Sequence, residues 1–173
     1  DTPVYNKSRN VFALNIAKKS KAGQVILTEG YMDTISLHQA GFDSAVASLG
    51  TALTPDHAQL LSRCFPQAIL AYDGDGAGVA AAQRAIPLLE KAGLKVRVLR
   101  VTGAKDPDEF IKAYGRDAFA RLLDRSENQV DYRLAQLQSK FDLADDAQKV
   151  AFLQEAAQLI AARPSAVERE IYG

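Results

Sequence analysis

Four short apolar segments, separated by helical patterns, constrain the fold of this chain more than any other feature. They cover residues 24–28 (QVILT), 44–48 (SAVAS), 67–72 (QAILAY) and 95–101 (KVRVLRV). The first three are continuous rather than alternating, which is typical of strands buried on both faces of a parallel sheet. Helical patterns lie between them, over residues 31–40, from Pro55 onward behind the N-cap Thr54, and over residues 78–92. We therefore expect an α/β fold, a parallel sheet of about four strands with flanking helices.

The part of the chain after residue 101 carries no further strand pattern. Helical patterns cover residues 109–114, 117–124, 128–139 and 147–162, and the last two have apolar residues at helical spacing. A length of 173 residues suits one domain with a small appendage. We expect a lead-in over residues 1–23, an α/β domain over residues 24–125 and the start of a helical bundle over residues 126–173.

The charges cancel overall but are segregated along the chain. The 21 basic and 21 acidic residues argue against a protein that grips nucleic acid by bulk positive charge. Residues 2–28 contain five bases and no acid, whereas residues 29–78 contain six acids and one base, Arg63. A basic lead-in therefore precedes an acidic segment.

Cysteine and histidine are scarce. Cys64 is the single cysteine, so an internal disulfide is excluded, and with only His38 and His57 beside it a structural zinc site is improbable. We assign the two histidines to surface or packing positions. No apolar run is long enough to span a membrane, and no signal peptide opens the chain. These features predict a cytoplasmic protein without a membrane partner.

Carboxylates follow three of the four predicted strands. Glu29 comes directly after the first strand, Asp73 and Asp75 follow the third, and Asp106 and Asp108 lie in the loop after the fourth. Because parallel strands end at one edge of the sheet, these side chains are expected to share a cleft. Their mutual repulsion would be relieved by Mg²⁺, a hard cation held by carboxylates and substrate phosphates. Two ions there would suit phosphoryl transfer.

Residues 73–78 (DGDGAG) also match parts of other motifs. An EF-hand loop fails because Arg84 occupies the position that requires Glu. A dinucleotide-binding turn is disfavoured because two aspartates would repel a pyrophosphate. An aspartate-nucleophile phosphatase, with Asp73 attacking phosphate, stays open, although it leaves Glu29 without a role and lacks a hydroxyl residue after the turn. A non-catalytic, metal-dependent nucleic-acid-binding module is a further alternative.

Five stretches of the chain, in order, resemble the motifs of the TOPRIM domain of bacterial DnaG-type primases. They are residues 3–10 (PVYNKSRN), 29–33 (EGYMD), 47–54 (ASLGTALT), 72–75 (YDGD) and 105–110 (KDPDEF). The resemblance covers roughly residues 3–125. It implies a DNA-directed RNA polymerase that makes short RNA primers from ribonucleoside triphosphates on a single-stranded DNA template at the bacterial replication fork.

The resemblance also implies roles for individual residues. Glu29, Asp73 and Asp75 would be the catalytic carboxylates and ligands of Mg²⁺, which Mn²⁺ can replace. Asp106 and Asp108 would be further metal ligands, and Asp33 an additional acid of the cleft. Lys7, Arg9 and Lys105 would contact nucleotide or template. Residues 1–23 would then be the end of an upstream polymerase subdomain.

The chain departs from the complete primase pattern. We expect the zinc-binding module, the upstream polymerase subdomain and the region that binds the replicative helicase to be absent from it. Gly76 stands where relatives often carry Arg, and Ala104 where Gly is common. We therefore expect this chain to bind metal but to synthesise primers weakly or not at all by itself.

Overall fold

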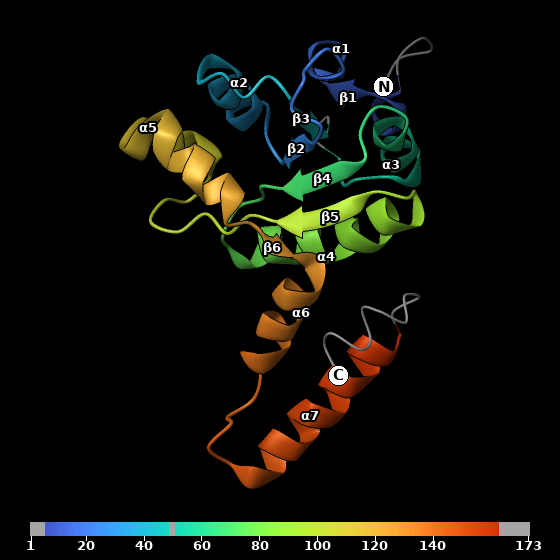
Figure 1. The fold of residues 1–173 in the computed structure, drawn as a ribbon, viewed down its shortest axis with the longest axis vertical. Coiled ribbons are helices and arrows are strands. Elements are labelled where there is room, and N and C mark those ends of the chain that lie inside the picture. The colour runs from blue at the N-terminus through green and yellow to red at the C-terminus, as the bar shows by residue number, and fades with distance from the viewer. Residues whose placement is uncertain (1–5, 49–50, 163–173) are drawn as a thin grey trace. The chain divides into compact units, whose positions relative to one another are not determined.

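A computed structural model describes residues 6–48 and 51–162 of the chain (Figure 1). The first and third motif stretches therefore lie partly outside the described residues. The chain divides into two compact units, residues 1–127 and 128–173. The strands of the first unit are β1 (Val11–Phe12), β2 (Val25–Thr28), β3 (Ala45–Ser48), β4 (Gln67–Leu70), β5 (Lys95–Val98) and β6 (Glu127–Asn128), the last of which ends at the unit boundary. Its helices are η1 (Lys7–Arg9), α1 (Leu14–Ala17), α2 (Tyr31–Gln39), α3 (Pro55–Ser62), α4 (Gly76–Lys91) and α5 (Pro107–Asp124).

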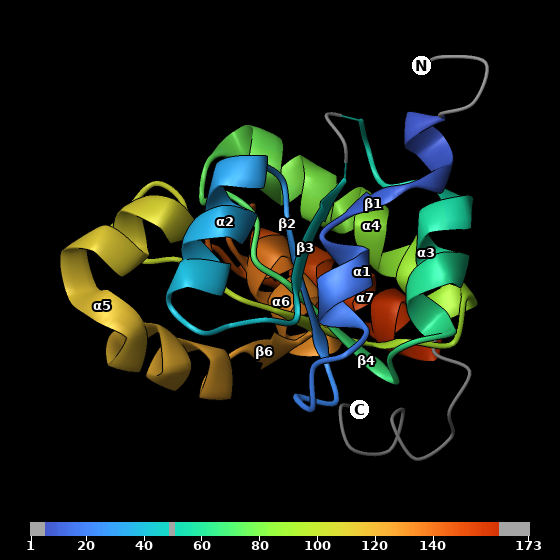
Figure 2. The same ribbon diagram turned by 90° about the horizontal axis from the view of Figure 1, so that it is seen from above.

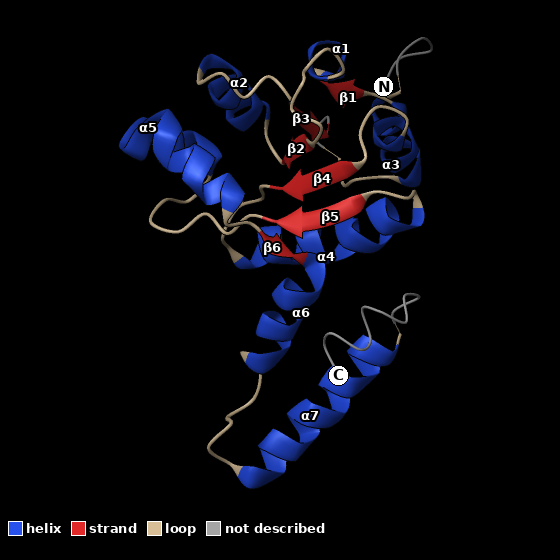
Figure 3. Ribbon diagram, in the orientation of Figure 1, coloured by secondary structure: helices blue, strands red, loops and turns tan. Residues whose placement is uncertain are grey.

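The strands form one sheet in the order β1-β3-β2-β4-β5-β6. Strands β3, β2, β4 and β5 pair in parallel, and these are the four strands that the sequence predicts. The arrowheads of β4 and β5 accordingly point the same way in Figure 3. Strand β1 pairs with β3 antiparallel, so the sheet is mixed rather than purely parallel. The carboxyl ends of β2, β4 and β5 still open onto one edge.

Helices cover both faces of the sheet. Helices α2 and α5 lie on one face and α3 and α4 on the other, as the view from above shows (Figure 2). On the first face, Ile26 and Ile69 of the sheet pack with Leu37 of α2 and with Phe110 and Phe119 of α5. Every residue of β2 and β3 is buried. This explains their continuous apolar sequences, because neither face of these strands meets water.

Local sequence sets where the helices begin and break. Thr54 caps α3 by accepting the backbone N–H of His57 at 3.1 Å, and Pro55 follows as its first residue, as predicted. Helix α5 is interrupted at Gly115, whose φ of 79° is open to glycine but disfavoured for other residues. The two helical patterns predicted over residues 109–114 and 117–124 are therefore two segments on either side of this break.

The second unit is helical, as the sequence predicts. It contains α6 (Gln129–Gln138) and α7 (Asp146–Ala161), each begun by a side-chain cap, from Asn128 and Asp145 respectively. The rings of Phe141 and Phe152 lie 6.1 Å apart and join the connecting turn to α7. In the part of the chain that the structure describes, no helix is long and apolar enough to cross a membrane.

Candidate metal-binding site

Glu29 and Asp73 meet at the carboxyl edge of the sheet. Glu29 is the residue after β2, and Asp73 lies three residues beyond β4, which neighbours β2 in the sheet. The Glu29 carboxylate accepts the backbone N–H of Asp73 at 3.3 Å. Two carboxylates separated by 44 positions are thus brought together by strand pairing, as the sequence predicts from strand order.

Asp75 lies at the start of α4. Its carboxylate oxygen Oδ1 accepts the backbone N–H of Gly78 at 2.8 Å, which makes Asp75 the N-cap of the helix. Gly78 fits closely beneath the site, because a Cβ atom there would lie 2.2 Å from the Asp73 carbonyl oxygen and 2.9 Å from Glu29 Oε1. The turn therefore depends on a glycine at this position, and Asp75 has a structural task beside any chemical one.

Asp33 and Asp106 extend the acidic edge. Asp33 is buried in the first turn of α2, and its carboxylate accepts the backbone N–H groups of Gly30 and Asp108 at 3.3 and 3.2 Å. Asp106 caps α5 by accepting the N–H of Glu109 at 2.8 Å. The loop before α5 is tied to the Asp73 turn, since the Gly74 N–H donates to the Lys105 carbonyl at 3.3 Å.

Asp108 is engaged away from this group. Its carboxylate binds the Lys112 ammonium at 2.6 Å and the Ser36 hydroxyl, and these donors hold its pKa below the usual range. A metal-binding role for Asp108, which the resemblance implies, would require these two donors to release it. The role stays a prediction.

Glu29, Asp73 and Asp33 each have a pKa above the usual value for their side chain. Burial raises the pKa of Glu29, and the charges of Asp73 and Asp75 raise it further. Burial also raises the pKa of Asp73, to which Asp106 and Asp75 contribute by repulsion. The pKa of Asp33 rises to about 6, mainly through burial and then through the charges of Asp106 and Asp73. A cluster whose members repel one another in this way favours a bound cation.

These residues fit Mg²⁺ as the cation. All of the donors are hard carboxylate oxygens, the type that Mg²⁺ prefers, and no competing thiolate or imidazole lies among them. Among the described residues, no three His, Cys, Asp or Glu side chains form a ready-made metal cage. Mg²⁺ sites in general use one or two carboxylates together with water and substrate phosphates.

A cavity of about 470 Å³ lies beside Glu29. Helix α4 supplies Arg84, whose positive charge lowers the pKa of Glu29. From sequence, Arg84 served only to exclude an EF-hand loop; the signal for a place near the carboxylates was its position nine residues beyond Asp75 on α4. The remaining lining residues are Ser48, Thr51, Ala52, Leu53, Tyr72, Ala77, Ala81, Ala85 and Leu88.

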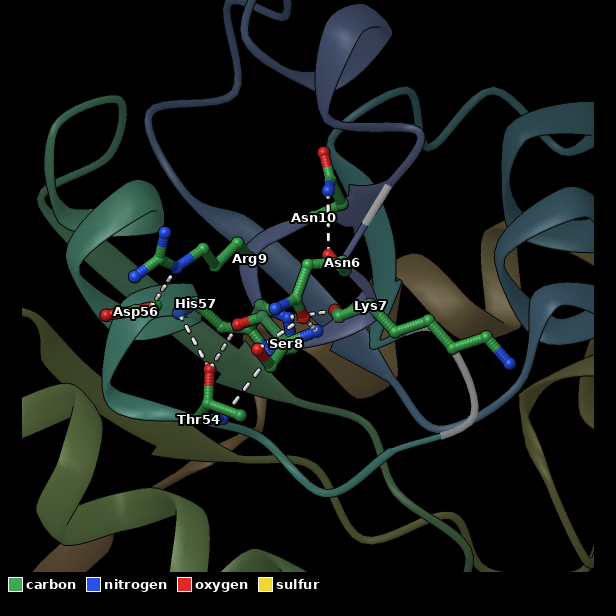
Figure 4. A network of polar contacts seen from close by, with 8 residues as sticks. All are labelled: Asn6, Lys7, Ser8, Arg9, Asn10, Thr54, Asp56 and His57. Atoms are coloured by element: carbon green, nitrogen blue, oxygen red, sulfur yellow. Dashed lines mark hydrogen bonds and ion pairs between the residues drawn. The ribbon is translucent and has the colours of Figure 1, made fainter. Parts of the chain in front are cut away.

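The basic residues predicted to contact nucleotide or template lie in two separate parts of the structure. Lys105 lies near the carboxylates, since its charge lowers the pKa of Asp73. Lys7 and Arg9 lie in η1 against the start of α3, where Arg9 Nε pairs with Asp56 Oδ2 at 3.1 Å (Figure 4). His57 is fully buried there and binds the Lys7 carbonyl through Nε2 at 2.8 Å. The sequence predicts only a surface or packing position for this histidine, and its role as a bridge between two segments of the chain is not apparent from the sequence.

Comparisons with known proteins agree with this fold. A family model described as Toprim-like matches residues 26–111. A DNA primase from Clostridium acetobutylicum is 38% identical over 99% of this chain, which spans 29% of that relative. The crystal structure of the zinc-binding and RNA polymerase domains of the Aquifex aeolicus primase superposes with a TM-score of 0.79 at 33% identity, covering 99% of this chain and 41% of that one. A DnaG primase catalytic domain bound to single-stranded DNA gives 0.82 at 30% identity, covering 99% and 57%.

The mixed sheet with acids at the carboxyl edge of its parallel strands and the matching family model define a TOPRIM domain. The relatives narrow the class further. The chain belongs to the DnaG-type DNA primase family, of which it carries the TOPRIM region. It spans about three-tenths of the length of the curated relatives that it matches.

One expectation is corrected by these comparisons. The region that binds the replicative helicase was expected to be absent from the chain. A family model described as the DnaB-helicase binding domain of primase instead matches residues 130–173. The helical pattern of this segment gave no indication of a partner, because amphipathic helices in a bundle and in a docking site have the same apolar spacing.

Proposed function

We propose that this chain is the metal-dependent nucleotidyltransferase core of a replicative primase, which joins ribonucleoside triphosphates into short RNA primers on single-stranded DNA. The observation that carries the proposal is the contact between Glu29 and the Asp73 turn at the carboxyl edge of a TOPRIM sheet. Two structural neighbours support this proposal. One is a DnaG primase catalytic domain bound to single-stranded DNA, which supports a single-stranded template, and the other contains a primase RNA polymerase domain, which supports the reaction.

Each residue at the edge has a role in this proposal. Glu29, Asp73 and Asp75 hold Mg²⁺ or, in its place, Mn²⁺, and Asp106 adds to the field that attracts the ion. The metal supplies charge neutralisation for the attacking 3′-hydroxyl and the leaving pyrophosphate. Lys105, which faces Asp73, contacts phosphate at the rim of the site. Arg84 favours the ionised form of Glu29 and so offsets a small part of the rise in its pKa that burial and the neighbouring carboxylates cause.

The metal site is tested by paramagnetic broadening. We expect Mn²⁺ added to ¹⁵N-labelled chain to broaden signals around Glu29, Asp73 and Asp75 first. The variants Glu29→Gln and Asp73→Asn should each lower the Mn²⁺ affinity about tenfold or more, since each removes a ligand or its nearest charge. Glu155→Gln, an exposed acid of α7, is the matched control and should bind Mn²⁺ like the wild type. Broadening centred elsewhere would contradict the site.

The reaction is tested in a full-length protein that carries this chain. Asp75→Asn should abolish primer synthesis from ribonucleoside triphosphates on a single-stranded template while the fold persists. Wild-type rates in this variant would overturn the proposal. The same assay on the 173-residue chain alone should give little or no primer, since the upstream subdomain predicted to line the template groove precedes residues 1–23 in the family pattern.

The phosphatase alternative makes a different prediction. A phosphatase would hydrolyse small phosphate esters through a phosphorylated Asp73, which Asp73→Asn would abolish. The family match favours the primase, because the relatives share the whole chain and not the turn alone. A non-catalytic nucleic-acid-binding module would retain its binding activity in the full-length protein after Asp75→Asn. A primase would lose primer synthesis, so the same variant distinguishes these two functions.

We further infer that residues 130–173 contact a DnaB-type helicase, which the matching family model supports. Helix α7 carries Val150 and Leu153 one turn apart, 54% and 55% exposed, as apolar groups suited to a partner. Val150→Asp with Leu153→Asp should abolish binding to the cognate helicase in a titration followed by fluorescence anisotropy. Gln154→Asp, which adds charge at an exposed polar position, should leave that binding near the wild-type level.

A further inference from the structure

A buried histidine and a threonine hold the basic segment in place. His57 Nδ1 accepts the Thr54 N–H at 3.3 Å, so the proton of the neutral ring lies on Nε2, which donates to the Lys7 carbonyl at 2.8 Å. The Thr54 hydroxyl donates to the Ser8 carbonyl at 2.7 Å. Two side chains from the start of α3 therefore fix two successive carbonyls of η1 (Figure 4). We name the pair Thr54 and His57 the latch.

The latch presents Arg9 over a pocket on the exposed face of α3. The pocket has a volume of about 370 Å³ and is lined by Arg9, Asp56, Gln59, Leu60 and Arg63. The four helix-associated residues lie at positions i, i+3, i+4 and i+7, so they share one face of α3. Arg9 joins them from η1, across 47 positions of sequence from Asp56.

The charges of this pocket suit an anion. Arg9 contacts Asp56 through Nε at 3.1 Å from Oδ2 (Figure 4), and its guanidinium carries further N–H donors. The ion pair is exposed, with side chains 73% and 51% accessible, so it is weak and water competes for it. With Arg63 the pocket holds two cations against one carboxylate. Gln59 adds an amide that can donate to oxygen.

We propose that Arg9 and Arg63 form a phosphate-binding site, separate from the carboxylate cleft, and that the Thr54–His57 latch positions Arg9 within it. Arginine is suited to this task because its planar fork matches phosphate oxygens. The phosphate belongs either to the backbone of single-stranded nucleic acid or to a nucleoside triphosphate. The choice of these two ligands rests on the proposed function, whereas the site itself is formed by residues that the proposed metal site does not use. Arg63 becomes a binding residue, and His57 a positioning residue.

The test measures binding to the wild-type 173-residue chain and to its variants. A fluorescein-labelled oligodeoxythymidine is titrated at several salt concentrations, and Mg²⁺–ATP is titrated in parallel. Arg63→Ala should weaken binding to one probe. If that probe is the oligonucleotide, the slope of log K against log salt should fall by about 0.7, the contribution of one phosphate contact on a single strand. Arg121→Ala, an exposed arginine on α5, is the control and should change neither measurement.

The role of the latch is tested with a double-mutant cycle. His57→Gln and Thr54→Val should each weaken binding of the same probe that Arg9→Ala affects. The double variant His57→Gln with Arg9→Ala should bind that probe as tightly as Arg9→Ala alone. Circular dichroism establishes that each variant is folded. Weaker binding of the oligonucleotide alone identifies a backbone phosphate as the ligand, and weaker binding of Mg²⁺–ATP alone identifies the nucleotide.

Three results would overturn the proposal. Arg63→Ala could bind both probes as Arg121→Ala does, the wild-type chain could bind neither probe at low salt, or the losses of affinity caused by the latch variants and by Arg9→Ala could simply add. Mn²⁺ binding at Glu29 and Asp73, measured on the same samples, shows whether the proposed function stands independently.

Discussion

The Glu29 carboxylate accepts the backbone N–H of Asp73, and this bond joins the ends of β2 and β4 at the point where the acids gather. Gly78 lies directly against the pair, because any Cβ there would meet both the Asp73 carbonyl and Glu29 Oε1. The geometry of the acidic turn therefore depends on a position that carries no functional group of its own.

Replacement of Gly78 by alanine should disrupt the site. The new methyl group would force the Asp73 turn away from α4, which we expect to lower the free energy of unfolding by about 1–3 kcal/mol and to weaken Mn²⁺ binding. Gly76→Ala is the matched control, since a Cβ at Gly76 meets nothing within 4 Å. That change should stabilise α4 slightly, because alanine is the better helix former. Urea denaturation and Mn²⁺ titration measure both effects, and equal behaviour of the two variants would be inconsistent with the close contact.

Asp75 combines a capping role with a proposed metal role, and two substitutions separate them. Asparagine caps helices as well as aspartate, so Asp75→Asn should retain the stability of the fold and lose Mn²⁺ affinity. Alanine removes the cap as well, so Asp75→Ala should lose a further ~1 kcal/mol of unfolding free energy. Thermal denaturation without metal measures the contribution of the cap to stability, and Mn²⁺ titration measures the contribution of Asp75 to metal affinity. If Asp75→Asn bound Mn²⁺ like the wild type, Asp75 would be a cap only.

The sequence predicted the parts of this molecule that repeat a local pattern. The four parallel strands are recognisable because most of their residues are buried and apolar, and the cap at Thr54 follows from local chemistry. Strands β1 and β6 were missed because two residues carry no periodicity, and β1 makes the sheet mixed. The edge at which the acids meet was predictable because topology, rather than side-chain detail, determines it.

What the sequence could not supply is the partner of each side chain. Asp108 lies in the same motif as Asp106, yet its carboxylate accepts hydrogen bonds from Ser36 and Lys112. His57 appeared to be an ordinary helix residue, because its acceptor at Lys7 lies 50 positions away. Such pairings depend on how the helices pack against the sheet, and the spacing of residues along the sequence does not determine that packing.

Arg97 ties the end of α5 to the sheet and is a test of the fold rather than of the site. From β5 its guanidinium donates to the carbonyls of Asp124 and Ser126 at 3.0 and 2.7 Å. Arg97→Met should lower the free energy of unfolding by about 1.5–3 kcal/mol, the range for hydrogen bonds from a charged group. Lys95→Met, at an exposed position of the same strand, should change it by no more than about 0.5 kcal/mol. Equal losses in the two variants would argue against an anchoring role for Arg97.

Asp33 should make the metal-free protein less stable as the pH rises. Its carboxyl group has a usual pKa of 3.8, which burial raises to about 6 in the folded protein. Below the lower value Asp33 is protonated in both states. Between the two values the unfolded chain releases the proton while the folded protein retains it, so stability is lost as the pH rises through about 6. The shift corresponds to a loss on the order of 2–3 kcal/mol.

Asp33→Asn removes this pH dependence and should therefore be more stable than the wild type at pH 7. The gain should be smaller than the full shift implies, because one amide oxygen replaces two carboxylate oxygens as acceptors for Gly30 and Asp108. Urea denaturation in the presence of a chelator, repeated across this pH range, measures the difference, with Asp117→Asn as an exposed control. The raised pKa of Glu29 and of Asp73 acts in the same direction, so some decline should persist in Asp33→Asn. If the stability of the wild type changed with pH in the same way as that of Asp33→Asn, Asp33 would be ionised in the folded protein at a lower pH than its burial implies.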